Sequence, residues 1–340
     1  MASPNDPVIV SLADLSDGTA DSHLVDAFGP DSLGIIVVKG LPARFIALRS
    51  QLLFFSSQLA SLPPAVLEGL ESPESHYLVG WSCGHEKLLD GQPDTLKGSY
   101  YANCSFYVDP NLEGAEVIEN GRWPMQEIAG YATPNLWPSE RAMAGFQTCF
   151  KEMIKIIIDT AVLVAQACDR YCVANVQDYT SGYLEHIVKT STTTKARLLH
   201  YFPVESTATH LKENWCGEHL DHGCLTGLTS AMFIDERTAP DTELVSSPDP
   251  ESGLYIRNRH GEIIKVNIPK DCLAFQTGQA LQVVTNNQFR AVPHFVKGSQ
   301  VPGICRNTLA VFCQPSLHEM VGADDFATFA RNIVTGNIVQ

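Results

Sequence analysis

The sequence predicts a mainly β protein with flanking helices. From Thr192 onward, short apolar segments alternate with turn-forming residues, a pattern typical of many short strands. Eight or so such strands predict a double-stranded β-helix, the jelly-roll, cupin-like architecture. The longest helical pattern, over residues 139–172, precedes them, and Ser139 suits its N-cap. We therefore expect an N-terminal helical region that wraps a jelly-roll core.

The N-terminal region also contains shorter elements. Residues 7–12 and 34–40 predict strands, the second one buried, because GIIVVKG is a continuous apolar run closed by glycine. A polar helix is expected around residues 22–28. Apolar residues recur at helical spacing over residues 42–60 and predict an amphipathic helix, which Pro63 ends.

The C-terminal half predicts the strands of the core. We expect one strand over residues 195–203, a second over 225–235 and a hairpin over 253–268. Four further strands are expected at 272–278, 279–286, 290–296 and 306–315. A helix follows over residues 318–334, with Asp324 and Asp325 near its N-terminus. The chain is expected to be one compact unit made of a wrap (1–190), the core (191–317) and a C-terminal helix (318–340).

Composition argues against several classes of function. The chain has 38 Asp and Glu against 23 Lys and Arg, and this net charge of −15 disfavours nucleic acids and anionic membranes as partners. It has no apolar run of membrane-spanning length and no secretory pattern at the N-terminus. The ten cysteines lack zinc-finger spacing, so we expect reduced, mostly buried thiols. A cytoplasmic monomer or weak homo-oligomer is the resulting expectation.

The stretch WCGEHLDHGCLTGLTSAMFID contains a candidate metal site. His219 and Asp221 are two residues apart, and alternate residues of a strand point to one face, so both side chains aim at one point. His294 is the candidate third ligand. Two histidines and one carboxylate, with coordination positions left open, is the site type of non-haem iron(II) oxygenases. Arg306 and Thr308 follow, and a guanidinium beside a hydroxyl suits a carboxylate ligand.

The order of these motifs resembles that of a known superfamily. Over residues 197–315 the chain resembles the iron(II)- and 2-oxoglutarate-dependent dioxygenases, in particular their isopenicillin N synthase-like branch. The family pattern HxDHGxLTxL matches HLDHGCLTGL here, and its RxS matches RNT at residues 306–308. The resemblance implies that His219, Asp221 and His294 bind iron(II). It also implies that Arg306 and Thr308 bind the distal carboxylate of 2-oxoglutarate.

The resemblance further implies an activity. Such an enzyme uses O2 and 2-oxoglutarate to hydroxylate or desaturate a small organic metabolite, and it releases succinate and CO2. Many relatives place a tyrosine of an NxYP segment on 2-oxoglutarate. Phe202 occupies that position here, and Tyr201 beside it is the candidate replacement. An isopenicillin N synthase-type oxidase without 2-oxoglutarate, a zinc hydrolase and a non-catalytic small-molecule-binding relative are the alternatives.

Two loops are candidates for substrate contacts. In related enzymes the region equivalent to residues 76–111 reaches across the mouth of the barrel, although a packed surface loop is an equal alternative here. Its candidate residues are Trp81, His85, Lys87, Lys97, Tyr100, Tyr101 and Asn103. The second loop, at residues 236–252, is acidic and rich in Pro and Ser.

Three cysteines lie close to the motifs in sequence, namely Cys216, Cys224 and Cys305. Core packing is the expected role of these thiols, because a free cysteine behaves as a small apolar residue. An oxidation-sensitive thiol near the iron is the alternative.

Overall fold

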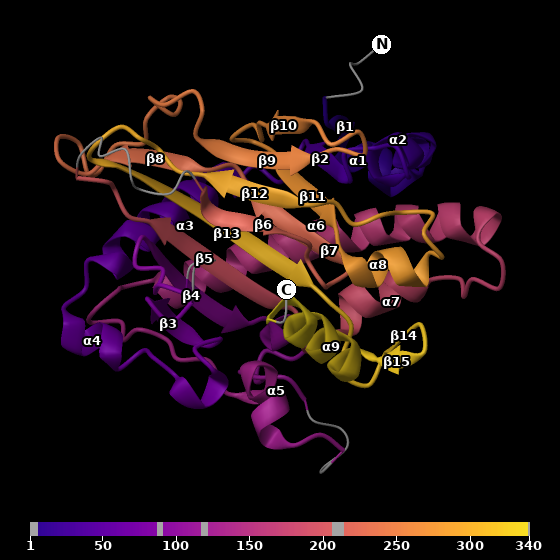
Figure 1. Cartoon of the computed structure of the whole chain (residues 1–340), viewed down its shortest axis with the longest axis horizontal. Helices are drawn as coiled ribbons and strands as arrows, with labels where there is room; N and C mark the ends of the chain where they lie inside the picture. Colours follow the sequence, from indigo (N-terminus) through magenta and orange to yellow (C-terminus); the bar gives the residue numbers. More distant parts are fainter. Residues whose placement is uncertain (1–5, 87–90, 117–121, 206–213, 339–340) are drawn as a thin grey trace.

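The computed structural model describes residues 6–86, 91–116, 122–205 and 214–338. Within these ranges the chain has a mixed α/β architecture, with a nine-stranded sheet, a four-stranded sheet and a small two-stranded ribbon (Figure 1). No described helix is long and apolar enough to cross a membrane. The predicted sheets with flanking helices are confirmed, in a mixed α/β fold rather than a mainly β one.

The nine-stranded sheet joins the two halves of the chain. Its order is β1-β2-β11-β7-β13-β5-β4-β3, and β8 also pairs with β13. The strands are β1 (Val8–Ser11), β2 (Ile35–Lys39), β3 (Gly80–Cys83), β4 (Lys97–Asn103), β5 (Lys195–Tyr201), β7 (Leu225–Thr229), β8 (Met232–Asp235), β11 (Leu273–Thr277) and β13 (Ile304–Cys313). The first four come from the region expected to wrap the core, so this region also builds the sheet.

The four-stranded sheet carries part of the candidate metal motif. Its order is β10-β9-β12-β6, and all of its pairs are antiparallel. The strands are β6 (Asn214–His219), β9 (Gly253–Arg257), β10 (Ile263–Val266) and β12 (His294–Lys297). The hairpin expected over residues 253–268 is confirmed as β9 and β10.

Helices cover one face of the larger sheet. The helices are α1 (Leu12–Asp17), α2 (Leu24–Phe28), α3 (Phe45–Ala60), α4 (Pro64–Glu68), α5 (Met125–Ala132), α6 (Phe146–Asn175), α7 (Tyr183–Thr190), α8 (Gln279–Val284) and α9 (Phe326–Ile338), with short 3-10 turns at Thr19–His23, Pro73–Ser75 and Ser105–Tyr107. The ribbon consists of β14 (Met320–Val321) and β15 (Asp324–Asp325). α3 packs on β5 and β13, and α6 packs on β7 and β13. In Figure 1 both helices lie behind the strands.

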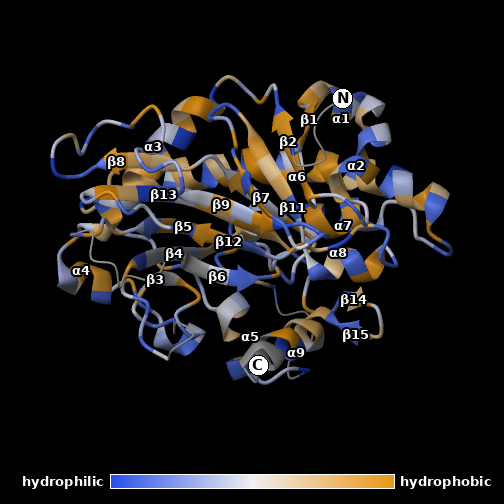
Figure 2. Cartoon of the chain, turned by 45° about the horizontal axis from the view of Figure 1, so that its top comes forward, coloured by the Kyte–Doolittle hydropathy of each residue, from blue (hydrophilic) through white to orange (hydrophobic). Residues whose placement is uncertain are grey.

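Strand β2 of the larger sheet is apolar on both faces. On β2, Ile36 and Val38 belong to the core shared with the helices, whereas Ile35 and Val37 belong to a second core toward the smaller sheet. Successive strand residues point to opposite faces, so a strand buried on both sides must be continuously apolar. This explains the run GIIVVKG, and Figure 2 shows β2 in the hydrophobic colours. The layers are therefore helices, larger sheet and smaller sheet.

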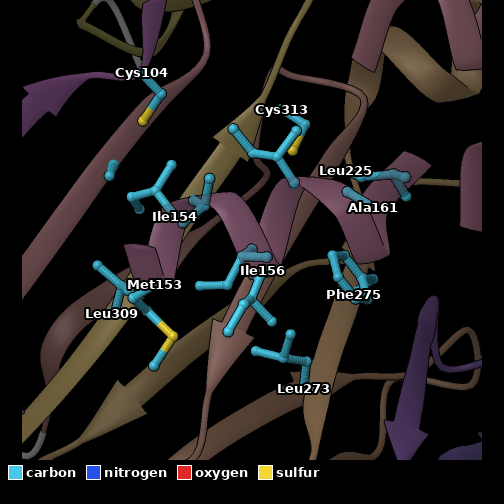
Figure 3. Close-up of a cluster of buried hydrophobic side chains, with 14 of the residues drawn as sticks. Cys104, Met153, Ile154, Ile156, Ala161, Leu225, Leu273, Phe275, Leu309 and Cys313 are labelled. Atoms are coloured by element: carbon cyan, nitrogen blue, oxygen red, sulfur yellow. The ribbon is translucent and has the colours of Figure 1, made fainter. Parts of the chain in front are cut away.

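Close packing against the larger sheet determines the position of α6. Figure 3 shows Ile154 and Ile156 of α6 among apolar side chains of the sheet such as Phe275. A Cβ at Gly227 on β7 would lie 2.6 Å from Cγ2 of Ile157. Only glycine leaves room for this approach, so the helix and the strand specify each other's position.

The strand expected over residues 225–235 is interrupted, and a buried arginine explains the break. The sheet breaks at Ser230 and Ala231, between β7 and β8. Arg49 of α3 is 1% exposed and donates to the carbonyl oxygens of Ser230 (3.2 Å) and Ala231 (3.0 Å). It also pairs through both terminal nitrogens with Glu243, at 3.1 and 3.0 Å. The expectation of one continuous strand was wrong because these carbonyls bond to a side chain and not to a neighbouring strand.

We expect Arg49→Met to lower the free energy of unfolding by roughly 3 kcal/mol, since it leaves the Ser230 hydroxyl and the carbonyl oxygens of Ser230 and Ala231 without their donor. Glu243 keeps its pair with Lys270, at 3.0 Å. Urea denaturation measures the effect. Arg44→Met is the matched control, because the pair of Arg44 with Glu152, at 3.6 Å, is exposed, and exposed pairs contribute less than about 1 kcal/mol. Equal midpoints for the two variants would contradict the role assigned to Arg49.

Three other predictions were wrong, one about the type of an element and two about where a helix begins. The segment 279–286, expected to be a strand, contains the helix α8, with Ala280 and Leu281 buried. A short apolar run is compatible with the periodicity of a helix or of a strand, so the sequence alone did not decide between them. The helix expected from Ser139 begins at Phe146, after Gly145 with φ +75°. The C-terminal helix begins at Phe326, not at residue 318. As expected, acidic residues lie at its start, and Asp325 Oδ1 accepts from the backbone N–H of Thr328 at 2.8 Å.

Candidate metal centre

The smaller sheet brings the two candidate histidine ligands together. His219 ends β6 and His294 begins β12, and the two residues are partners in the antiparallel register. Their ring centroids lie 4.3 Å apart. Asp221 lies two residues after the end of β6, and its carboxylate points toward both imidazole rings. Residues far apart in sequence thus meet at one edge of the smaller sheet.

The three side chains converge in a geometry that suits a metal ion. Oδ1 of Asp221 lies 3.7 Å from Nε2 of His219 and 3.9 Å from Nε2 of His294. One ligand atom from each residue falls within 4.8 Å of the other two. The side chains of Asp221 and His294 are 7% and 9% exposed, whereas that of His219 is 41% exposed. Two buried ligands and one open side are what a metal site needs if it must also admit other molecules.

Neighbouring polar groups orient each ligand. The hydroxyl of Thr226 on β7 donates to Oδ2 of Asp221 at 2.5 Å, which leaves Oδ1 toward the imidazoles. Nδ1 of His219 lies 2.8 Å from the carbonyl oxygen of Gly217, to which it donates when Nε2 is the ligand. Such outer partners commonly fix the tautomer of a metal-binding histidine.

Gln276 on β11 orients the imidazole of His294. Its amide nitrogen lies 2.6 Å from Nδ1 of His294, and its buried Oε1 has no hydrogen-bond partner among the described residues. Ligation through Nε2 requires a proton on Nδ1. With Nδ1 protonated, the Gln276 amide would turn its oxygen toward Nδ1, which would satisfy both groups at once. Thr226 and Gln276 were missed by sequence reasoning, although both lie within or beside the motifs.

The protonation states of the cluster favour a cation. Burial lowers the pKa of His294 to about 4, and Asp221 only partly opposes this shift. Burial also opposes ionisation of Asp221, but His294, His219 and the Thr226 hydrogen bond outweigh it and hold the pKa of Asp221 below its ordinary value. A carboxylate and a neutral imidazole at neutral pH are the forms that bind metals.

The cluster opens into a cavity of about 600 Å³ lined by both sheets. Its walls are mostly apolar and include Leu199, Leu228, Leu254, Val266, Val296 and Phe312. Among the described lining residues, Asp221 is the only acid, whereas the bases are Arg197, Lys265, Lys270 and Arg306. Arg197 is paired with Glu86, and Lys270 is paired with Glu243 at 3.0 Å, so Lys265 and Arg306 are the lining bases that can offer charge to a ligand.

Arg306 and Thr308 lie in the same cavity as the cluster. Both are on β13, two residues apart, and therefore face the same side of the sheet. They are 5% and 7% exposed. Tyr201 pairs with Arg306 across β5 and β13, and its ring centroid lies 5.1 Å from the guanidinium carbon. The structure thus brings all six candidate site residues to one cavity.

Phe202 and the first loop lie elsewhere. Phe202 packs against His200 with ring centroids 4.6 Å apart and does not line the cavity, whereas Tyr201 does. None of the described residues in 76–111 lines the cavity. The prediction of a loop was wrong for Gly80–Cys83 and Lys97–Asn103, which form β3 and β4 of the larger sheet. Lys87 lies outside the described residues. The second loop does line it, through Leu244–Ser247, Pro250 and Ser252.

Two of the three cysteines near the motifs have described side chains. Cys224 and Cys305 are fully buried, and burial raises the pKa of both thiols. Neither lines the cavity. The side chain of Cys216 lies outside the described residues.

Comparison with solved structures identifies the fold. The chain is similar to a full-length Neurospora crassa protein solved in complex with alpha-KG and 5-formyluracil, with a TM-score of 0.66 and 18% identity over 96% of this chain and 90% of that one. It is similar to the rice dioxygenase for auxin oxidation (TM-score 0.62, 16% identity, 97% and 96% covered). It is also similar to JOX2 in complex with 2OG, Fe and JA (TM-score 0.60, 13% identity, 93% and 77% covered).

These similarities extend over nearly the whole chain, so the fold is that of iron- and 2-oxoglutarate-dependent oxygenases. The resemblance seen in the sequence motifs is confirmed at the level of the fold. No protein-family model matches the chain, and no curated protein matches it. At 13–18% identity the likeness to these structures concerns the fold alone.

Proposed function

We propose that the chain is a non-haem iron(II)- and 2-oxoglutarate-dependent dioxygenase that hydroxylates or desaturates a small organic metabolite, with release of succinate and CO2. The observation that carries the proposal is one cavity that holds both a His219–Asp221–His294 cluster and the Arg306–Thr308 pair. The donor set of two imidazole nitrogens and one carboxylate oxygen fits iron(II). The two sheets that enclose the cavity are proposed to form the double-stranded β-helix of the isopenicillin N synthase-like branch.

The residues of the cavity have distinct roles in this proposal. Asp221, held by Thr226, and His294, held by Gln276, provide the rigid part of the metal site. Arg306 offers a planar fork to the distal carboxylate of 2-oxoglutarate, and Thr308 adds a hydroxyl. The ring of Tyr201 beside the guanidinium limits where that carboxylate can lie.

Iron, when bound, supplies the activation of O2 that couples oxidation of 2-oxoglutarate to oxidation of the substrate. The chain's own residues orient the co-substrate and exclude water through the apolar walls. The loop at 236–252 lines the same cavity and is proposed to select the substrate. Beyond Arg306, which is assigned to 2-oxoglutarate, Lys265 is the lining base that is proposed to meet a carboxylate of the substrate.

Oxygen uptake by the iron-loaded protein tests the proposal, measured with a panel of small carboxylated metabolites. We expect uptake that depends on 2-oxoglutarate and yields one succinate per O2 consumed. Uptake that proceeds fully without 2-oxoglutarate would assign the chain to the isopenicillin N synthase-type oxidases instead. Hydrolysis supported by zinc alone would assign it to neither.

A further inference from the structure

A second cluster of ligand-type side chains lies behind the cavity. His200 on β5, Cys305 on β13 and Glu236, directly after β8, each place one ligand-type atom within 4.8 Å of the other two. Arg306 faces the cavity, so its neighbour Cys305 faces the opposite side of the sheet, toward α3. There Sγ of Cys305 lies 3.7 Å from the hydroxyl of Ser57. None of the three lines the cavity, so the cluster is separate from the candidate iron site.

Asn307 determines which nitrogen of His200 carries the proton. The amide nitrogen of Asn307 donates to the carbonyl oxygen of Leu53 at 2.9 Å and to the hydroxyl of Ser57 at 2.8 Å. Its oxygen is therefore the atom 2.8 Å from Nδ1 of His200. An amide oxygen can only accept, so Nδ1 carries the hydrogen and Nε2 keeps a lone pair. That lone pair faces the cluster, since Nε2 lies 3.8 Å from Oε1 of Glu236.

We propose that His200 Nε2, Cys305 Sγ and Glu236 form a second metal site, for a divalent ion of the zinc class. A nitrogen, a sulfur and an oxygen donor suit a borderline ion that prefers four ligands. A metal-binding histidine usually donates its other N–H to an acceptor oxygen, and the amide oxygen of Asn307 is in that position here. His200 and Cys305 are 2% and 0% exposed, whereas the side chain of Glu236 is 28% exposed, so water can complete the coordination there.

Charge balance is favourable at this site. On binding, the thiol of Cys305 loses its proton to solvent and a sulfur–metal bond forms, with no change of oxidation state. The thiolate and the Glu236 carboxylate then neutralise the two positive charges of the ion. This matters because an uncompensated charge beneath α3 would be costly.

A metal ion here would join three strands directly behind the 2-oxoglutarate residues. His200 precedes Tyr201 on β5, and Cys305 precedes Arg306 on β13. The ion would hold these two strands and the end of β8 in fixed register. We therefore expect the site to stabilise the fold, with a melting temperature that rises with zinc concentration.

Cobalt(II) titration of Asp221→Ala protein tests the proposal independently of the iron site. We expect one equivalent of cobalt to produce the near-ultraviolet charge-transfer band of a thiolate–cobalt bond and to release one proton. The cavity cluster contains no sulfur, so it cannot produce this band. In the same background Cys305→Ser should abolish the band, whereas Cys83→Ser, which changes a half-buried cysteine on β3, should retain it.

Absence of the band in folded protein, or its persistence in Cys305→Ser, would overturn the proposal. Glu236→Gln keeps the test decisive if Cys305→Ser does not fold, because Glu236 is partly exposed. That variant should retain the band and bind cobalt at least about tenfold more weakly. Unchanged affinity in Glu236→Gln would equally contradict the site. Succinate formation by the wild-type protein is scored separately, so failure of one proposal does not hide failure of the other.

Discussion

Replacing Asp221 with alanine is expected to abolish iron binding and all formation of succinate. Asp221 is the only carboxylate of the cluster, and its Oδ1 lies within 4 Å of Nε2 of both histidines. Without it, two imidazoles remain, of which His219 is substantially exposed. Loss of a supporting partner alone typically weakens metal binding by about 10–100-fold, so loss of the ligand itself should cost more. Equilibrium dialysis with iron(II) under anaerobic conditions measures the effect.

Thr226→Val provides a graded comparison for this prediction. It removes only the hydroxyl that donates to Oδ2 of Asp221 and keeps the size of the side chain. Iron should still bind, with an affinity reduced by about 10–100-fold. If Asp221→Ala protein bound iron as tightly as Thr226→Val protein, the carboxylate would not be a ligand.

Arg306→Ala is expected to raise the KM for 2-oxoglutarate by roughly 30- to 1000-fold, because truncating one partner of a buried charge pair costs about 2–4 kcal/mol. The affinity for iron(II) should remain unchanged, since Arg306 is not among the clustered ligand side chains. Steady-state assays of succinate formation across a range of 2-oxoglutarate concentrations measure the shift.

Two further variants show whether the effect depends on the planar guanidinium of Arg306 and on its position. Arg306→Lys keeps the charge but loses the planar fork, so its KM should lie between those of the wild type and Arg306→Ala. Arg257→Ala removes an exposed arginine paired with Glu218 and should leave the KM unchanged. An Arg306→Ala protein with a normal KM for 2-oxoglutarate but an altered KM for substrate would show that Arg306 binds the substrate instead.

Much of the candidate site was predictable because it rests on short local patterns. The HxD pair and the RxT segment are short patterns, and the distal histidine follows from the order in which these motifs occur in the resembling family. The structure brings all three to one cavity. Tyr201 was the candidate because Phe202, at the family's tyrosine position, cannot donate a hydrogen bond. In the structure Tyr201 lines the cavity and Phe202 does not.

Other features depend on contacts between distant parts of the chain. Arg49 interrupts a strand that lies 181 residues away in sequence, and nothing near residue 49 predicts this contact. The helix α8 and the strand predicted in its place fit the same short apolar run, and only packing decides between them. The His200–Glu236–Cys305 cluster joins three elements with no shared motif, so its proximity appears only in the folded chain.

Anaerobic titration of the purified protein with iron(II) and then 2-oxoglutarate tests the central claim most directly. The dioxygenase proposal predicts that the weak visible charge-transfer band of the iron–2-oxoglutarate chelate appears and saturates at one equivalent of iron. The band should be absent in Asp221→Ala protein and should require much more 2-oxoglutarate in Arg306→Ala protein. Iron binding without any band at millimolar 2-oxoglutarate would contradict the proposed co-substrate, and failure to bind iron would contradict the metal centre itself.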